Sequence, residues 1–166
     1  MSVNKISYSS RQFPQEKIWI EIIQSMEYLY AELADNQAQI EKKNQELSQA
    51  KEFIENVLDS MADTLVVIDN QGRIKRVNRA TLELLGYKEK EILGKPVQSI
   101  LVLEEKKKSS LGGQPLHKFL IRQEVQNLEM SYLGKRGEKI PMSFNGSFLR
   151  NVEGKVVGVI LVARDM

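Results

Sequence analysis

The chain of 166 residues contains no cysteine and a single histidine, His117. Without cysteine it can form no disulfide, no cysteine-ligated zinc site and no iron–sulfur cluster, and it has no thiol nucleophile. A large part of metalloprotein and redox chemistry is therefore excluded before any other residue is considered.

Long hydrophobic runs and a strong charge imbalance are also missing. No stretch approaches the roughly 18 apolar residues that span a bilayer, and the beginning of the chain has no apolar block like that of a secretory signal. The formal net charge of +2 is too small to imply a nucleic-acid partner. We therefore expect a cytoplasmic protein that binds neither a membrane nor nucleic acid.

Glycine and proline are absent from much of the first half. All ten glycines lie between Gly72 and Gly158, and Pro14 is the only proline before Pro96. A long interval without either residue is typical of a long helix. We expect a flexible tail over residues 1–14, a coiled-coil helix over residues 15–61 and a globular domain over residues 62–166.

The helical interval has a heptad repeat. Apolar residues recur every seven positions, with companions three residues later, over about six heptads. This predicted dimer seam consists of Trp19, Ile22, Met26, Leu29, Leu33, Ile40, Leu47, Ile54, Val57 and Met61. A narrow apolar seam needs a partner helix, and the simplest partner is the same segment of a second chain in a parallel homodimer. The alternative is one amphipathic helix folded back on its own globular domain.

The second half has the pattern of an α+β domain. Residues 79–85 form a predicted helix that Asn78 can cap and Gly86 can end. Residues 104–113, with the run Lys106 to Lys108, are expected to form a solvated polar loop. The predicted strands are residues 64–69, 73–77, 128–132, 140–148 and 156–163. We expect a five-stranded antiparallel sheet with short helices on one face.

Several short motifs, in order, resemble those of Per-Arnt-Sim (PAS) sensor domains. They are residues 69–72, 77–78, 84–87, 91–95, 135–138, 154–158 and 163–165. The resemblance covers residues 54–166 and implies a five-stranded antiparallel sheet that holds a small apolar cavity against its helices. The preceding heptads resemble the signalling helices of bacterial sensor histidine kinases. Asp165 matches the family residue at the exit from the last strand, where a signal leaves the domain.

No catalytic apparatus is recognisable in the sequence. His117 lacks the flanking residues of a phosphoacceptor helix, and Gly112-Gly113 is not followed by the Lys and Ser or Thr of a phosphate-binding loop. We expect a non-catalytic input module of a sensor histidine kinase, which relays a ligand- or partner-induced change through its coiled coil. The alternatives are a ligand-free dimerisation scaffold, or the input module of a diguanylate cyclase or a phosphatase.

The resemblance raises the question of a cofactor. The missing cysteine excludes a cysteinyl-flavin adduct and a cinnamoyl chromophore, and Trp19 is far in sequence from any cavity for FAD. His117 is a candidate haem ligand, although it falls later in the chain than the axial histidine of haem-binding relatives. A small apolar ligand remains open. Candidate cavity residues are Val66, Ile68, Leu82, Leu85, Met130, Met142, Phe144 and Ile160.

Overall fold

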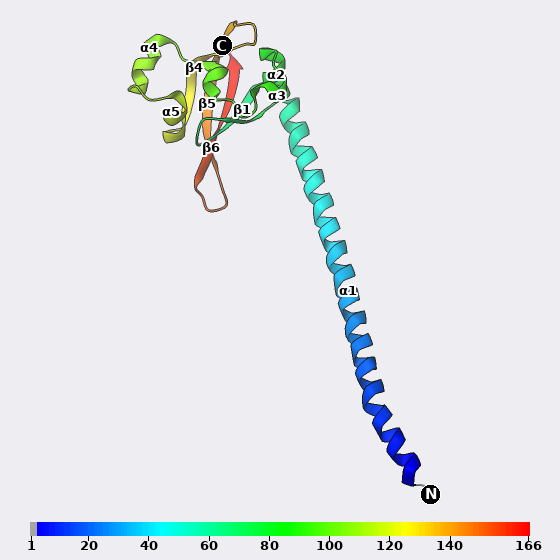
Figure 1. The fold of residues 1–166 in the computed structure, drawn as a ribbon. Coiled ribbons are helices and arrows are strands. Elements are labelled where there is room, and N and C mark those ends of the chain that lie inside the picture. The colour runs from blue at the N-terminus through cyan, green and yellow to red at the C-terminus, as the bar shows by residue number, and fades with distance from the viewer. Residues whose placement is uncertain (1–2) are drawn as a thin grey trace. The chain divides into compact units, whose positions relative to one another are not determined.

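A single long helix forms the first part of the chain. In the computed structural model, residues 3–166 are described, with side chains from residue 14 onward, and α1 extends over Val3–Ser60 (Figure 1). Its 58 residues give a length of about 87 Å at 1.5 Å per residue. The helix begins earlier than expected and includes Pro14, so residues 3–14, expected as a tail, belong to α1. The side chains of residues 1–13 lie outside the described residues.

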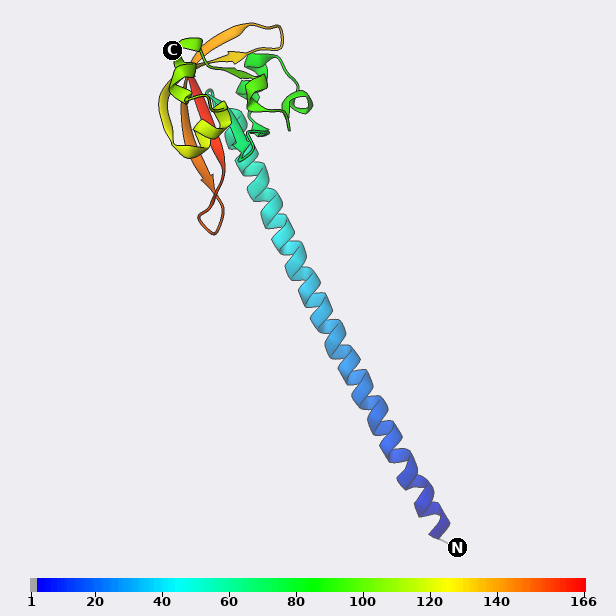
Figure 2. The ribbon, with the colours of Figure 1, turned by 60° about the vertical axis from the view of Figure 1, so that its left-hand side comes forward.

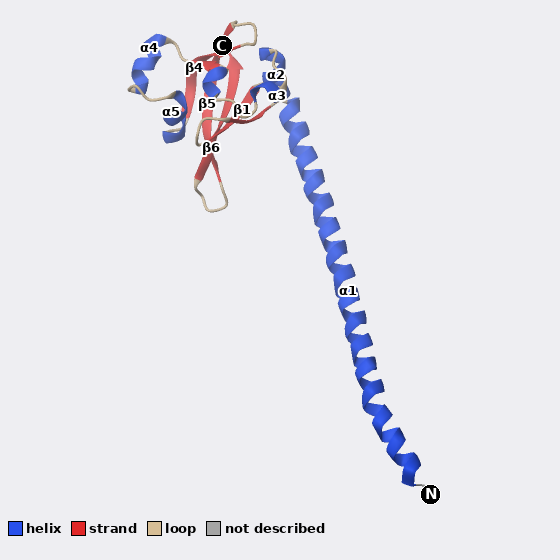
Figure 3. Cartoon of the chain, in the orientation of Figure 1, coloured by secondary structure: helices blue, strands red, loops and turns tan. Residues whose placement is uncertain are grey.

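Residues 54–166 form a separate compact unit, here called the globular unit. Its sheet has the strand order β2-β1-β6-β5-β4-β3, and every neighbouring pair is antiparallel. Figure 3 shows these strands in red. The strands are β1 (Thr64–Asp69), β2 (Ile74–Val77), β3 (Leu101–Val102), β4 (Val125–Leu133), β5 (Lys139–Arg150) and β6 (Val156–Asp165).

The sheet has six strands where five were expected. The additional strand is β3, whose Leu101 and Val102 pair with Tyr132 and Ser131 of β4. Two residues are too few to show a period of two, so only pairing with β4 makes this segment a strand. The β5–β6 hairpin projects from the rest of the sheet (Figure 2).

Short helices follow the second and third strands. The predicted helix α2 (Arg79–Leu85) is confirmed: Asn78 accepts a hydrogen bond from the Thr81 amide, and Gly86 ends the helix at φ 78°. The expected polar loop over residues 104–113 is instead largely helical. The other helices are α3 (Glu89–Ile92), α4 (Glu105–Lys108) and α5 (Leu116–Arg122), with 3₁₀ turns η1 (Val97–Ser99) and η2 (Ser109–Leu111).

The hydrophobic core lies between these helices and one face of the sheet. Alternate strand residues such as Ile68, Phe144 and Leu161 are fully buried, and they cluster with Leu85 of α2 and Leu120 of α5. Burying one such side chain contributes about 1.5–3 kcal/mol. The fold class and the placement of the helices against the sheet are thus as expected.

Candidate functional site

Most residues predicted to line a cavity instead form the packed core. Six of them are fully or almost fully buried in one cluster: Val66, Ile68, Leu85, Met130, Met142 and Phe144. Leu82 is partly buried and packs against the same cluster. The Phe144 ring meets the ring of Tyr132 edge to face, with centroids 4.9 Å apart. These side chains contact one another, as expected of a core at crystal-like density.

Ile160 lies on the other face of the sheet from this cluster. It pairs with Val67 of β1 and Ser147 of β5, whereas Phe144 pairs with Ala163. Residues directly opposite each other share a face, and successive residues alternate between faces. Ile160 therefore belongs with Val67 and Ser147 and does not line the core.

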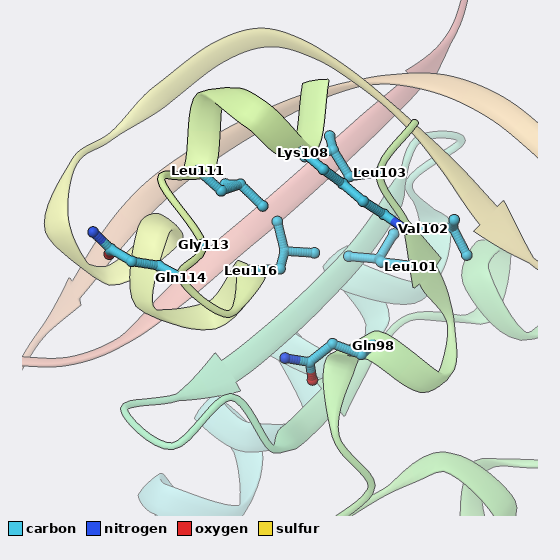
Figure 4. Close-up of a pocket in the computed structure, with 9 residues that line it drawn as sticks. All are labelled: Gln98, Leu101, Val102, Leu103, Lys108, Leu111, Gly113, Gln114 and Leu116. Carbon is cyan, nitrogen blue, oxygen red and sulfur yellow. The ribbon is translucent and has the colours of Figure 1, made fainter. Parts of the chain in front are cut away.

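A cavity of about 440 Å³ lies beside β3, away from the centre of the core. It is bounded by η1, β3, α4, η2 and the beginning of α5, and Figure 4 shows the side chains around it. None of the eight predicted cavity residues lines this space. Its lining residues are Gln98, Leu101, Val102, Leu103, Lys108, Leu111, Gly113, Gln114 and Leu116.

The lining combines an apolar wall with three polar side chains. Leu101, Leu103, Leu111 and Leu116 are buried, so their side chains are held in place by the surrounding structure. Such a mixture, mainly apolar with a few polar groups, is typical of small-molecule sites. Sequence reasoning missed this site because Lys108 stood in a segment expected to be a solvated loop.

The two neighbouring lysines of α4 have different surroundings. The Lys107 ammonium donates a hydrogen bond of 2.6 Å to Glu129 of β4. This hydrogen bond, together with the charge of Lys107, lowers the pKa of the Glu129 carboxyl. Lys108 extends from α4 across the cavity towards Val102 of β3 (Figure 4).

His117, the candidate haem ligand, is in the first turn of α5 but does not line this cavity. Its Nδ1 atom is 3.1 Å from Nε2 of Gln98, within hydrogen-bond distance. A β-carbon added at Gly72 would come within 2.4 Å of His117 Cβ, so this glycine leaves the room that the imidazole occupies. The ring is therefore packed against Gly72 and Gln98.

A second polar centre lies within the globular unit, where the last turn of α1 contacts the buried Asn78 side chain. Its Nδ2 donates to the carbonyls of Leu58 (3.2 Å) and Asp63 (2.8 Å). Its Oδ1 accepts from the amides of Leu65 (3.0 Å) and Thr81 (3.1 Å). One amide side chain thereby links the end of α1, the following loop, β1 and α2. The cap was predicted, but the links to Leu58 and Asp63 were not.

Two further contacts join the same segments. Glu55 of α1 lies 3.6 Å from Arg76 of β2. Asp59 accepts a hydrogen bond of 3.3 Å from the Arg79 amide at the start of α2. We call the segment of residues 55–63, together with Arg76, Asn78 and Arg79, the junction.

The end of β6 also contacts the junction. Arg164 donates a 2.9 Å hydrogen bond to Asp63. The next residue, Asp165, is exposed and stands opposite Met142 in the β5–β6 register. The predicted signal-exit residue is therefore adjacent to one that contacts the junction.

The predicted seam residues on α1 are exposed in the single chain. Their exposed fractions range from 42% at Ile22 to 68% at Leu47, and Met61, just past the end of the helix, is half-buried. Apolar side chains so exposed along one helix present a surface for a partner.

Tyr132 is the one described residue whose pKa is strongly perturbed. Burial raises the pKa of its phenol, and hydrogen bonds with Thr64 and Thr81 offset this only in part. Its hydroxyl lies 2.8 Å from Thr64 Oγ1 in the core. This tyrosine is thus a neutral core residue with a satisfied hydroxyl.

Among the side chains of residues 14–166, no cluster of three or more His, Asp or Glu is arranged to hold a metal ion. No helix in this described range is long and apolar enough to cross a membrane.

Comparison with known proteins gives a consistent result. The sequence profile of a family described as PAS domain matches residues 62–166. The signal transduction histidine-protein kinase AtoS of Escherichia coli is 24% identical over 122 residues, which cover 74% of this chain and 19% of AtoS. The sensor protein kinase WalK of Staphylococcus aureus is 28% identical over 118 residues, which cover 70% of this chain and 25% of WalK.

A solved structure supports the fold. The PAS domain of an HTR-like protein from Haloarcula marismortui superimposes with a TM-score of 0.59 at 18% identity, over 76% of this chain and 99% of that domain. The chain itself spans a quarter or less of the length of the two kinases.

Proposed function

Because this chain belongs to the PAS domain family, we propose that it is the non-catalytic, cytoplasmic input module of a sensor histidine kinase. Two chains would pair through α1 as a parallel coiled coil. The similarity to AtoS and WalK supports a kinase output over a diguanylate cyclase or a phosphatase. The catalytic part would lie in a region that the matched segment of these relatives does not include.

The junction is the observation that carries this proposal. Asn78 holds the Leu58 carbonyl of α1 and the Thr81 amide of α2 through one side chain. A shift of α2 or β1 would therefore displace the groups bonded to Asn78 at the end of α1. Hydrogen-bonded networks between rigid elements are suited to couple two arrangements of those elements.

The seam supports pairing of two copies. Burying a Leu or Ile side chain contributes about 1.5–3 kcal/mol, so a zipped pair would gain from each exposed seam position. Asn36 and Lys43 occupy the inward positions near the centre of the seam. Polar residues at such positions weaken a coiled coil but specify its register. A coil with a weakened centre is suited to change its packing in response to a signal.

A pair of matched double variants tests the seam. Leu33→Lys with Ile40→Lys should convert a dimer to a monomer in light scattering, because two charges would enter the apolar contact in each chain. Ala38→Lys with Gln45→Lys places the same charges outside the heptad contact positions and should leave the dimer intact. A dimer that survives the first pair, or a chain already monomeric without substitution, would refute pairing through α1.

The second candidate is a ligand-free dimerisation scaffold. The packed core favours it, since six predicted cavity residues contact one another instead of enclosing a space. A thermal-shift screen separates the two candidates, because a ligand that binds only the native state raises its melting temperature. The scaffold predicts no response to any small molecule, whereas the sensor predicts a selective response.

A further inference from the structure

We propose that the cavity beside β3 binds a monocarboxylate with an apolar tail of about six to ten carbons, a size suited to a small-molecule site. The ligand's carboxylate would pair with the Lys108 ammonium. An effect of this ligand on signalling would rest on the sensory role proposed above. Binding itself follows from the cavity.

The apolar wall accounts for the tail. Leu101 and Leu103 on one side and Leu111 and Leu116 on the other are buried and hold the cavity open between β3 and α5. The volume of about 440 Å³ is within the range of pockets that enclose small organic molecules. A tail placed there would exchange water for leucine contacts, which favours binding in proportion to the apolar area removed from water.

The single charged side chain in the lining determines the charge that the ligand should carry. Lys108 is the only charged residue among the nine that line the cavity, and none of them is an aspartate or glutamate. In the described part of the chain, Lys108 takes part in none of the five ion pairs, while its neighbour Lys107 is paired with Glu129. One ammonium without a protein carboxylate favours one anionic group on the ligand.

Two amide side chains can orient that group. Gln98 and Gln114 line the same cavity from η1 and from the loop before α5. An amide nitrogen carries two hydrogens, so Gln98 can remain bonded to His117 and still donate one hydrogen to a ligand oxygen. An ionised carboxylate can accept from more donors than an alcohol can, and a protonated amine can accept from none.

The cavity is connected to the sheet through β3. Leu101 pairs with Tyr132 of β4, and the Tyr132 hydroxyl lies 2.8 Å from Thr64 in β1. The next residue of β1, Leu65, donates its amide hydrogen to Asn78 of the junction. An occupant that moves β3 would therefore act on elements that reach the junction through direct contacts.

Octanoate is the probe for this test, with isothermal titration calorimetry on the whole chain and amide NMR to locate the site. We expect saturable binding with a Kd between about 1 µM and 1 mM. Each methylene added from hexanoate to octanoate should tighten binding about fourfold. Amide shifts should concentrate at the lining residues, including Leu103 and Gln114.

Two matched variants test the role of Lys108. Lys108→Gln should weaken octanoate binding about tenfold, because a hydrogen bond to a charged group is lost. Lys106→Gln removes the same charge from an exposed position of α4 that does not line the cavity, and it should change the Kd by less than about twofold. Octan-1-ol, which has the same chain without the charge, should bind both variants and the unchanged protein equally.

The outcomes separate this inference from the proposed function. Absence of binding at millimolar octanoate, equal binding by the Lys108→Gln variant, or shifts confined to another region would overturn the ligand assignment. If octanoate binds as described but leaves kinase output in the complete protein unchanged, the ligand site stands and the sensory role fails. If light scattering shows that α1 does not pair two chains, the octanoate titration still tests the ligand site independently.

Discussion

Replacement of Asn78 by alanine tests whether the junction is held by one side chain. Asn78 is 1% exposed and makes four hydrogen bonds to main-chain groups of three elements and a loop. Its removal would take a partner from the Asp63 carbonyl and the Thr81 amide. The Leu58 carbonyl would keep a hydrogen bond from the Met61 amide at 3.4 Å, and the Leu65 amide would keep its hydrogen bond to Thr81 Oγ1 at 3.0 Å.

The magnitude follows from these partners. A buried polar group left without its hydrogen bond costs about 1–3 kcal/mol, and the loss of an N-cap costs about 0.5–2 kcal/mol. Since the Thr81 amide is also the group that the cap satisfies, the two contributions overlap, and we expect Asn78→Ala to lower the free energy of unfolding by about 3 kcal/mol. For a domain of this size the melting temperature should fall by about 12–20 °C.

Differential scanning calorimetry on the whole chain measures this change in stability. Two further substitutions serve as comparisons. Asn78→Ser retains an oxygen that can cap α2 but cannot reach Leu58 and Asp63, so it should cost about 1 kcal/mol less than alanine. Asn70→Ala removes a single exposed hydrogen bond to Val156 and should cost less than about 1 kcal/mol. If Asn78→Ala costs no more than Asn70→Ala, the reasoning about the junction is wrong.

The remaining predictions concern an exit residue, a tight turn and one carboxylate. Asp165→Ala should leave the melting temperature nearly unchanged, since the side chain is exposed, but alter output in the complete protein; normal output would remove the exit role. Gly72 and Gly86 both have φ +78°, but an alanine β-carbon at Gly72 would meet the His117 side chain, whereas one at Gly86 would meet nothing. Thermal unfolding should therefore show that Gly72→Ala destabilises the domain more than Gly86→Ala does. Burial raises the pKa of the Asp69 carboxyl, but hydrogen bonds from two backbone amides and the charge of a nearby lysine outweigh burial and lower this pKa below 3.8. An NMR titration should therefore place the titration midpoint of Asp69 below pH 3.8. The stability that this carboxylate contributes above pH 3.8 should be lost as the pH falls through its folded-state pKa.

Several elements are determined by residues close together in the sequence. The absence of glycine and of proline after Pro14 predicts an uninterrupted α1 as far as Ser60, and the heptad spacing predicts its apolar seam. Asn78 and Gly86 determine the two ends of α2, since a cap and a left-handed residue act within one turn of the helix. Five strands were predictable from β-branched runs and turns for the same reason: each signal is local.

Only the tertiary structure decided which residues surround a cavity and which form the core. The apolar run of β6 gives no alternation, so the face of Ile160 became known only from its register with Val67 and Ser147. Lys108, Gln98 and Leu116 are separated in sequence by turns and short helices, yet they line one space. Periodicity and caps depend on neighbours along the chain, whereas strand register and cavity walls depend on contacts between distant segments, which exist only after the chain has folded.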